Sequence, residues 1–258
     1  MKRALSGYAL PLFSALVYLF LYVPIVILVL FSFNSSEVPY RWEHVTLRWY
    51  KQLFATPEVL LATENTLIIA CAASLLSLAM GLTYVFLAKK FRLQPFIGLF
   101  YAGTALPEII IAVGMLSFFS FFNVPLGITT LIAGHTVLGL GFVIPIIKAQ
   151  YAEIDPILTE ASLDLGASQR HTFFKIILPL LTPSLVAGGL LTFILSLDDF
   201  LISFFCSGVG AQTLSLYIFS LIRLGASPVI NALSSVILVT SSLLVLLFCL
   251  LKIKSKVL

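Results

Sequence analysis

Charged side chains are scarce in this sequence: only 10% of its 258 residues are Asp, Glu, Lys or Arg, whereas 60% are hydrophobic. Soluble domains usually carry about a quarter of charged residues, so the scarcity excludes an ordinary soluble protein. The mean hydropathy of +1.11 predicts a protein that crosses a membrane several times. The formal net charge of +4 is small and does not indicate a nucleic-acid-binding surface.

The patterns that mark common catalytic and cofactor sites are also missing. No G-x-x-x-x-G-K-[ST] sequence occurs, which argues against ATP binding by a P-loop in this chain. No H-E-x-x-H or Ser/His/Asp pattern indicates an enzyme, and we expect no cofactor or metal. The cysteines and histidines are widely separated, so they suggest no disulfide framework and no site. They are Cys71, Cys206, Cys249, His44, His135 and His171.

Long apolar runs are what the sequence has in abundance. Six of them are long enough to cross a membrane, at residues 8–33, 66–88, 95–122, 128–147, 178–205 and 229–251. The first is too long for a signal-peptide core and lacks a convincing cleavage site, so we expect a retained span. The second contains small residues, among them Ser74, Ser77 and Gly81, that let another helix approach closely. The predicted fold is all-α, with six transmembrane helices.

Basic residues are unevenly distributed between the two sides that six spans define. The side with both termini holds Lys2, Arg3, Lys89, Lys90, Arg92, Lys148, Arg170, Lys175, Lys252, Lys254 and Lys256. The opposite side holds Arg41, Arg48, Lys51 and Arg223. Because loops rich in Lys and Arg stay in the cytoplasm, we expect both termini there.

The longest polar loop on the opposite side, residues 34–64, is rich in aromatic residues. It contains Tyr40, Trp42, Trp49 and Tyr50. We expect these rings to anchor the loop at the membrane surface, where Trp and Tyr are enriched. Residues 47–54, LRWYKQLF, have the pattern of a short amphipathic helix on that surface.

A polar segment, residues 155–183, interrupts the apolar chain after the fourth run. Asp155 suits a helix N-cap and Pro156 the first helical position, while Gly166 suits the left-handed residue that ends a helix. Ser168 can then cap a second short helix. One face of the first helix is apolar, with Ile157, Leu158, Ala161 and Leu165 at helical spacing. The pattern predicts a helix-turn-helix on the membrane surface; the alternative is an ordinary amphipathic connector.

The same segment resembles the EAA-x3-G-x9-I-x-L-P signature of ABC-importer permeases. The matching residues are Glu160, Ala161, Ser162, Gly166, Ile176, Leu178 and Pro179, with Ser162 in place of the usual second alanine. In that family the segment forms coupling helices that dock into a cleft on a cytoplasmic ATPase subunit. The resemblance implies coupling helices at about 155–178, with docking contacts from Glu160, Ala161, Ser162, Asp164, Gly166 and Arg170.

The resemblance also has implications for the whole chain. It implies a type I ABC importer permease fold, with residues 1–258 as a single transmembrane permease domain in the bacterial cytoplasmic (inner) membrane. The implied partners are a second permease subunit, two cytoplasmic ATPase subunits that bind the ATP, and an extracytoplasmic substrate-binding protein. The lipid bilayer surrounds the chain, and no nucleic acid is involved.

Three carboxylates, Glu108, Asp198 and Asp199, lie within the apolar runs. A charge near the centre of a membrane helix costs about 2.5–3.5 kcal/mol on insertion scales, so such residues usually face a water-filled path. Counting the helical rise places Asp198 near the outer end of its span and Glu108 deeper. Neighbouring residues point about 100° apart, so Asp198 and Asp199 should not both face one path. The structural alternative is that they cap a helix break or pair with a base such as Arg223.

Several stretches resemble the second permease subunit of spermidine/putrescine ABC importers. They are FILSLDDFLISFF followed by Gly208, ALPEIIIAVGML around Glu108, and INALSSVILV in the last run. The implied cargo is a polycation, which needs carboxylates and aromatic faces in place of its water. The candidate path residues are Glu108, Asp198, Asp199 and Tyr217. Two alternatives stay open: another small solute, or an ion-coupled secondary transporter, for which no paired broken helices are visible.

Overall fold

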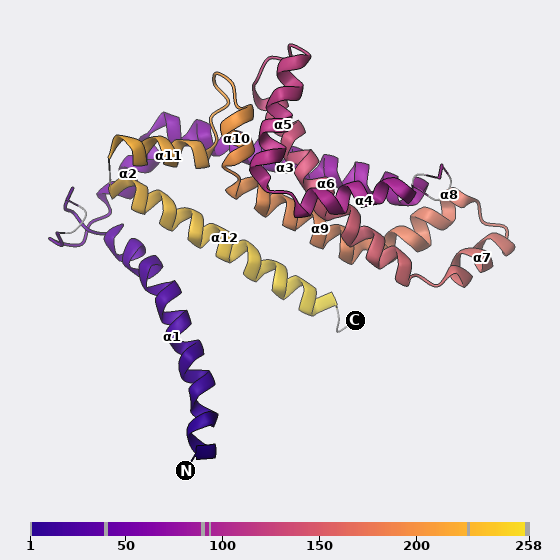
Figure 1. Ribbon diagram of the computed structural model, residues 1–258, viewed down its shortest axis with the longest axis horizontal. Helices are drawn as coiled ribbons and strands as arrows, with labels where there is room; N and C mark the ends of the chain where they lie inside the picture. Colours follow the sequence, from indigo (N-terminus) through magenta and orange to yellow (C-terminus); the bar gives the residue numbers. More distant parts are fainter. Residues whose placement is uncertain (1, 39–40, 89–90, 93, 226–227, 256–258) are drawn as a thin grey trace. The chain divides into compact units, whose positions relative to one another are not determined.

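The structure is a computed structural model that describes residues 2–38, 41–88, 91–92, 94–225 and 228–255. The described residues form helices and no strand, as predicted (Figure 1). The chain divides into two compact units, Met1–Leu60 with Ile218–Leu258, and Leu61–Tyr217. Some residues named above lie outside the described backbone or have undescribed side chains: Lys2, Arg3, Tyr40, Lys89, Lys90, Cys249, Lys252, Lys254 and Lys256.

Helices long and apolar enough to cross a membrane account for four of the predicted spans. They are Leu10–Phe31 within α1 (Lys2–Phe31), α3 (Pro57–Ala88), α6 (Ile128–Glu153) and the stretch Gln169–Asp198 that ends with α9 (Leu178–Asp198). A bent helix pair makes a fifth if it counts as one span. The sixth predicted span falls in α12 (Pro228–Ser255), whose described apolar part, Pro228–Leu243, is shorter than a span, so six spans remains a prediction.

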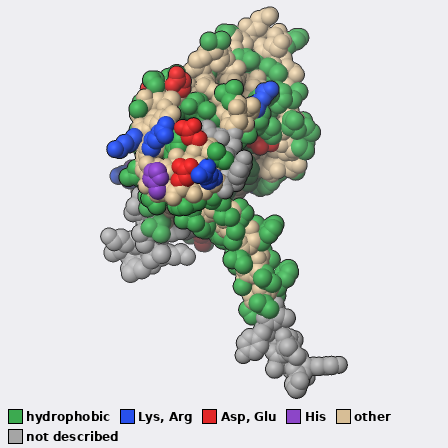
Figure 2. Space-filling model, turned by 90° about the vertical axis from the view of Figure 1, so that its left-hand side faces the viewer, with side chains coloured by type: hydrophobic (Ala, Val, Ile, Leu, Met, Phe, Trp, Pro, Cys, Tyr) green, Lys and Arg blue, Asp and Glu red, His purple; other side chains and the backbone are tan. Residues whose placement is uncertain are grey.

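The surface of the molecule is dominated by apolar side chains, as a lipid environment requires. Figure 2 shows hydrophobic side chains spread across the visible face, with most of the charged ones gathered in one area. On α1, Leu10 and Phe20 are 73% and 79% exposed. An exposed apolar surface of this kind indicates contact with lipid or with another protein.

The boundaries of three predicted spans are wrong. α3 begins at Pro57 and takes the last part of the predicted loop 34–64. The third run is two helices, α4 (Ile97–Ala105) and α5 (Glu108–Phe121), whose axes differ by 117°. The fifth run is also interrupted, because α9 ends at Asp198 and a short α10 (Leu201–Cys206) follows.

Small residues allow the helices of the Leu61–Tyr217 unit to pack closely. The Ser74 hydroxyl on α3 donates to the Gly189 carbonyl on α9 at 2.7 Å, and the Ser77 hydroxyl donates to the Thr136 carbonyl on α6 at 3.1 Å. A Cβ on Gly81 would lie 2.7 Å from Val143. The predicted role of the small residues in the second run is confirmed.

The loop before α2 (Arg48–Ala55) is held by hydrogen bonds within its own unit. The indole Nε1 of Trp49 donates to the Asn34 carbonyl at 2.6 Å, and Trp49 is buried. The Asn34 side chain accepts from the Glu43 amide at 3.0 Å and donates to the Arg41 carbonyl at 2.7 Å. Surface anchoring by Trp49 was therefore the wrong expectation, because its side chain is buried and bonded to the loop backbone. The predicted short helix is confirmed as α2.

The helix-turn-helix of the polar segment is confirmed in its local details. The Asp155 carboxylate caps α7 (Pro156–Asp164) by accepting from the Ile157 amide at 3.0 Å. Gly166 has a φ of +84°, and the Ser168 hydroxyl caps α8 (Gln169–Thr172) by accepting from the His171 amide at 3.2 Å. The sequence pattern gave no sign of the π-helical turn η2 (Phe173–Ile177) that joins α8 to α9.

Close packing at Gly139 on α6 generates a stability prediction. A Cβ there would lie against the Ser77 hydroxyl and 2.5 Å from the Thr192 Cγ2. We expect Gly139→Ala to destabilise the protein by about 1–3 kcal/mol, because neither neighbouring helix can withdraw freely. The matched control is Gly114→Ala on α5, where a Cβ meets nothing within 4 Å. Equal thermal stability of the two variants in detergent would contradict this packing.

Candidate functional site

Two breaks between helices lie on either side of one cavity in the Leu61–Tyr217 unit. Leu106 and Pro107 are extended, with ψ of 140° and 132°. Leu106 avoids the helical conformation because it precedes a proline. Asp199 is also extended, with ψ of 127°, between α9 and α10. Each break ends one helix and starts another in a new direction.

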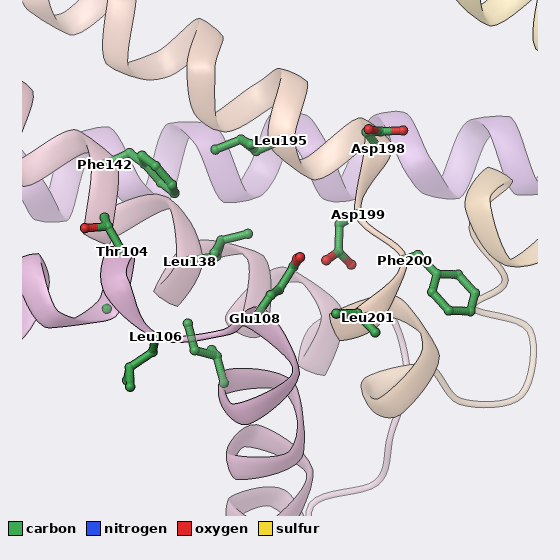
Figure 3. Close-up of a pocket in the computed structure, with 12 residues that line it drawn as sticks. Thr104, Leu106, Glu108, Leu138, Phe142, Leu195, Asp198, Asp199, Phe200 and Leu201 are labelled. Atoms are coloured by element: carbon green, nitrogen blue, oxygen red, sulfur yellow. The ribbon is translucent and has the colours of Figure 1, made fainter.

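The cavity between these breaks has a volume of about 340 Å³. Its walls come from α4, α5, α6, α9 and α10, and Figure 3 shows most of the lining side chains. The lining residues are Gly103, Thr104, Leu106, Glu108, Ile111, Leu138, Phe142, Leu195, Asp198, Asp199, Phe200 and Leu201. Three of the four predicted path residues therefore lie at one place.

The carboxylate of Asp199 is buried, with the residue only 5% exposed. It accepts from the first amides of α10, at 2.8 Å from Ser203 N and 3.3 Å from Ile202 N. Its Oδ2 also lies 3.3 Å from Nε2 of His135. The Asp199 backbone carbonyl accepts from the Ser215 hydroxyl at 2.6 Å. Asp199 therefore caps a helix break and pairs with a base, as the structural alternative proposed.

The base that pairs with Asp199 was not expected from the sequence. His135 on α6 is 1% exposed, and its Nδ1 lies 2.6 Å from the Ser196 hydroxyl on α9. The histidines were not expected to belong to a site; His135 does not line the cavity but contacts Asp199, which does. The sequence signal for this contact was a titratable side chain inside an apolar run. Arg223, the expected partner, belongs to the other unit, where its guanidinium lies 5.7 Å from the Phe219 ring centroid.

Glu108 and Asp198 are the more accessible carboxylates of the cavity. Glu108, at the start of α5, is partly exposed, and Figure 3 shows its carboxylate pointing toward Asp199. Asp198 is exposed, and its side chain points away from that of Asp199, as their adjacency on the chain requires. The expected difference in depth between Glu108 and Asp198 stays a prediction; it was counted along a continuous helix, whereas the chain bends by 117° before Glu108.

The remaining predicted site residues lie elsewhere. Tyr217 is on α11 (Leu214–Leu224), outside the cavity lining. The predicted docking residues of the polar segment do not line the cavity either; Glu160, Ala161, Asp164, Gly166 and Arg170 are exposed on the helix-turn-helix. Ser162 differs from them, because it is buried and its hydroxyl lies 2.9 Å from the Thr172 hydroxyl, which ties α7 to α8. Within the described part of the chain, no group of three or more His, Cys, Asp or Glu is arranged to hold a metal ion.

Comparison with known proteins places the chain among transport proteins. Residues 73–253 match the family described as binding-protein-dependent transport system inner membrane component. The chain is 36% identical over 237 residues to the spermidine/putrescine transport system permease protein PotC of Escherichia coli (strain K12), which covers 91% of this chain and 90% of that protein. It is 35% identical over 229 residues to the putrescine transport system permease protein PotI of the same strain, covering 85% and 82%.

A solved structure supports the fold. The crystal structure of a bacterial ABC transporter involved in the import of the acidic polysaccharide alginate matches with a TM-score of 0.73, covering 97% of this chain and 96% of that one. The sequence identity is 15%, so this likeness shows the fold, that of a type I ABC importer permease, and nothing of the cargo.

The contrast between the two adjacent aspartates predicts different effects on stability. Asp199→Asn places an amide among groups that donate to a carboxylate, so we expect a loss of about 1–3 kcal/mol. Asp198→Asn, at an exposed position, should change stability by about 0.5 kcal/mol or less. Thermal unfolding of the two purified variants is the measurement, and a larger loss for Asp198→Asn would refute the assignment of Asp199 as the structural carboxylate.

Proposed function

The chain belongs to the family of binding-protein-dependent transport system inner membrane components, and on that premise we propose that its cargo is a polyamine such as spermidine or putrescine. The chain is a permease subunit of an ABC importer. The observation that carries the cargo proposal is the cavity at the two helix breaks. Glu108, Asp198 and Asp199 line it, and the described residues of its wall include no Lys or Arg.

The chemistry of this cavity suits an elongated organic cation. Small-ligand sites range from about 300 to 1,000 Å³, and the cavity volume of about 340 Å³ lies at the small end of that range. Away from bulk water, carboxylates attract a protonated amine more strongly than they would at the surface. Phe142 and Phe200 bring aromatic rings to the wall, whose faces attract ammonium groups. The apolar residues between them suit the methylene segments of such a cargo.

The three carboxylates differ in exposure, and we assign them different roles. Glu108 and Asp198 are accessible, so we assign them the direct contacts with cargo. Asp199 is buried and its oxygens are occupied by donors from α10 and α6, so it contributes negative charge from the wall. Tyr217 does not line the cavity and is not among the proposed contacts.

The proposed assembly follows from the family. This chain would pair with a second permease subunit, two cytoplasmic ATPase subunits that bind ATP, and an extracytoplasmic substrate-binding protein. The excess of Lys and Arg on the side of the termini favours six spans in the bacterial inner membrane with both termini in the cytoplasm. Residues 1–258 would then form one transmembrane permease domain, whose helices move between outward- and inward-open states as the ATPase subunits close and open.

The helix-turn-helix is the proposed contact with an ATPase subunit. α7 and its C-cap residue present exposed apolar side chains, with Ile157 64% and Leu165 88% exposed. Glu160 and Asp164 are exposed beside it. An apolar stripe with adjacent acidic residues suits a partner cleft that has an apolar floor and a basic rim. Gly166 and Ser162 would shape the turn rather than contact the partner.

The cargo remains the point on which the alternatives differ. Another small solute, carried by the same class of permease, would need no carboxylates at the cavity. An ion-coupled secondary transporter was disfavoured partly because no inverted repeat with paired broken helices was visible in the sequence; the structure adds two helix breaks. Membership of an importer family that works with binding proteins now decides against it.

Removing the accessible charges tests the cargo. We expect Asp198→Asn and Glu108→Gln each to raise the KM for labelled spermidine by about tenfold, because a buried ammonium loses an ionised partner. Uptake into vesicles that contain the complete importer is the measurement. Glu64→Gln on α3 makes the same chemical change at an exposed position outside the cavity and should leave the KM unchanged. Normal spermidine uptake by both cavity variants would leave another solute as the better cargo.

The turn at Gly166 tests the coupling assignment. We expect Gly166→Val to abolish most cargo-stimulated ATP hydrolysis, because a β-branched residue is strained at a φ of +84°. Gly166→Asn is the control, since Asn tolerates this conformation.

Two further variants test the same segment. Glu160→Lys should weaken ATPase binding by repelling a basic rim. A cysteine at Ser168 should react with a labelling reagent only from the cytoplasmic side. Full stimulation in the Val and Lys variants would contradict the assignment.

A further inference from the structure

One side chain outside the cavity lining contacts both sides of the break between α9 and α10. The His135 ring is 1% exposed, with Nδ1 2.6 Å from the Ser196 hydroxyl on α9. On the other edge, Nε2 lies 3.3 Å from Oδ2 of Asp199 and 3.5 Å from the Ser203 hydroxyl on α10. The imidazole therefore links the last turn of one helix to the first turn of the next.

Asp199 connects the His135 contacts to the cavity, because it lines the cavity wall. The same carboxylate that faces His135 accepts from the α10 amides and points toward Glu108 across the cavity wall (Figure 3). Its neighbour in the chain is Asp198, the exposed carboxylate at the end of α9. A different side-chain rotamer of Asp199 would change the charge that Glu108 meets.

We propose that His135 is a positioning residue for cargo recognition, which holds Asp199 by an Nε2–H donor and so fixes the carboxylate that faces Glu108 at the cavity wall. This inference rests on the proposed polyamine transport. His135 acts through Asp199 and does not touch the cargo.

The arrangement of partners favours a neutral imidazole in this role. A neutral ring with the proton on Nε2 donates to Asp199, while Nδ1 accepts from the Ser196 hydroxyl, so both nitrogens are satisfied. The proposal therefore requires a donor at the Nε2 position and not a positive charge.

Two amide substitutions separate this role from simple packing. The amide nitrogen of Gln reaches the position of Nε2, whereas that of Asn reaches only the position of Nδ1, facing Ser196. We expect His135→Gln to keep the KM for labelled spermidine within about twofold, and His135→Asn and His135→Phe to raise it about tenfold, with a smaller change in Vmax. Uptake is measured in vesicles with the complete importer and its binding protein.

Thr192→Val on α9 is the control for loss of a buried polar group. Thr192 is 1% exposed, and its hydroxyl has no hydrogen-bond partner among the described residues, so its removal should leave the KM unchanged. If His135→Asn matched His135→Gln in KM, or if every His135 variant lowered thermal stability and Vmax equally without moving the KM, the positioning role would be overturned. Absence of spermidine uptake by the unmodified importer would instead overturn the proposed function, and this inference with it.

Discussion

A carboxylate buried at an interrupted helix is the interaction on which the centre of this structure depends. Within the hydrocarbon layer no water satisfies a free amide, so a chain that leaves the helical conformation needs a replacement partner for each one. Asp199 supplies two such partners to α10, and His135 in turn supplies a donor to Asp199. The break is therefore stable because a polar network of four side chains, from α6, α9, α10 and the turn between them, closes around it.

The position of this network also explains how an apolar protein can hold a polar cavity. The break before α5 turns the chain by 117°, which brings Glu108 to the same wall as Asp199 although the two lie on different predicted spans. Two interrupted helices leave a space that continuous helices would fill with side chains. The small residues of α3, α6 and α9 keep the surrounding bundle close-packed, so the space stays confined to the breaks.

Local features of this fold could be predicted from the sequence, whereas contacts between distant helices could not. Asp155, Gly166 and Ser168 act on amides or angles within a few residues of themselves, so their neighbours in the chain were sufficient to assign them. Pro107 was visible, but the run around it is so apolar that a continuous helix was the natural expectation. The carboxylates were recognisable as misplaced charges, yet their division into buried and accessible groups depends on His135, which reaches Asp199 only when α6 packs beside α9 and α10. Trp49 was misassigned for the same reason, since its partner is a carbonyl in a distant part of the loop.

The π-helical turn at Phe173–Ile177 has a geometric consequence for communication along the chain. A π turn takes one residue more than an α turn, and each residue advances a helix by about 100°. The extra residue therefore rotates the side chains of α8 relative to those of α9. The side of α9 that packs on α6 and the side of α8 that is presented outward are not in line along one continuous helix. Replacing this turn by regular α-helix with one residue fewer would rotate α8 by about 100° about the helix axis and so present another of its faces.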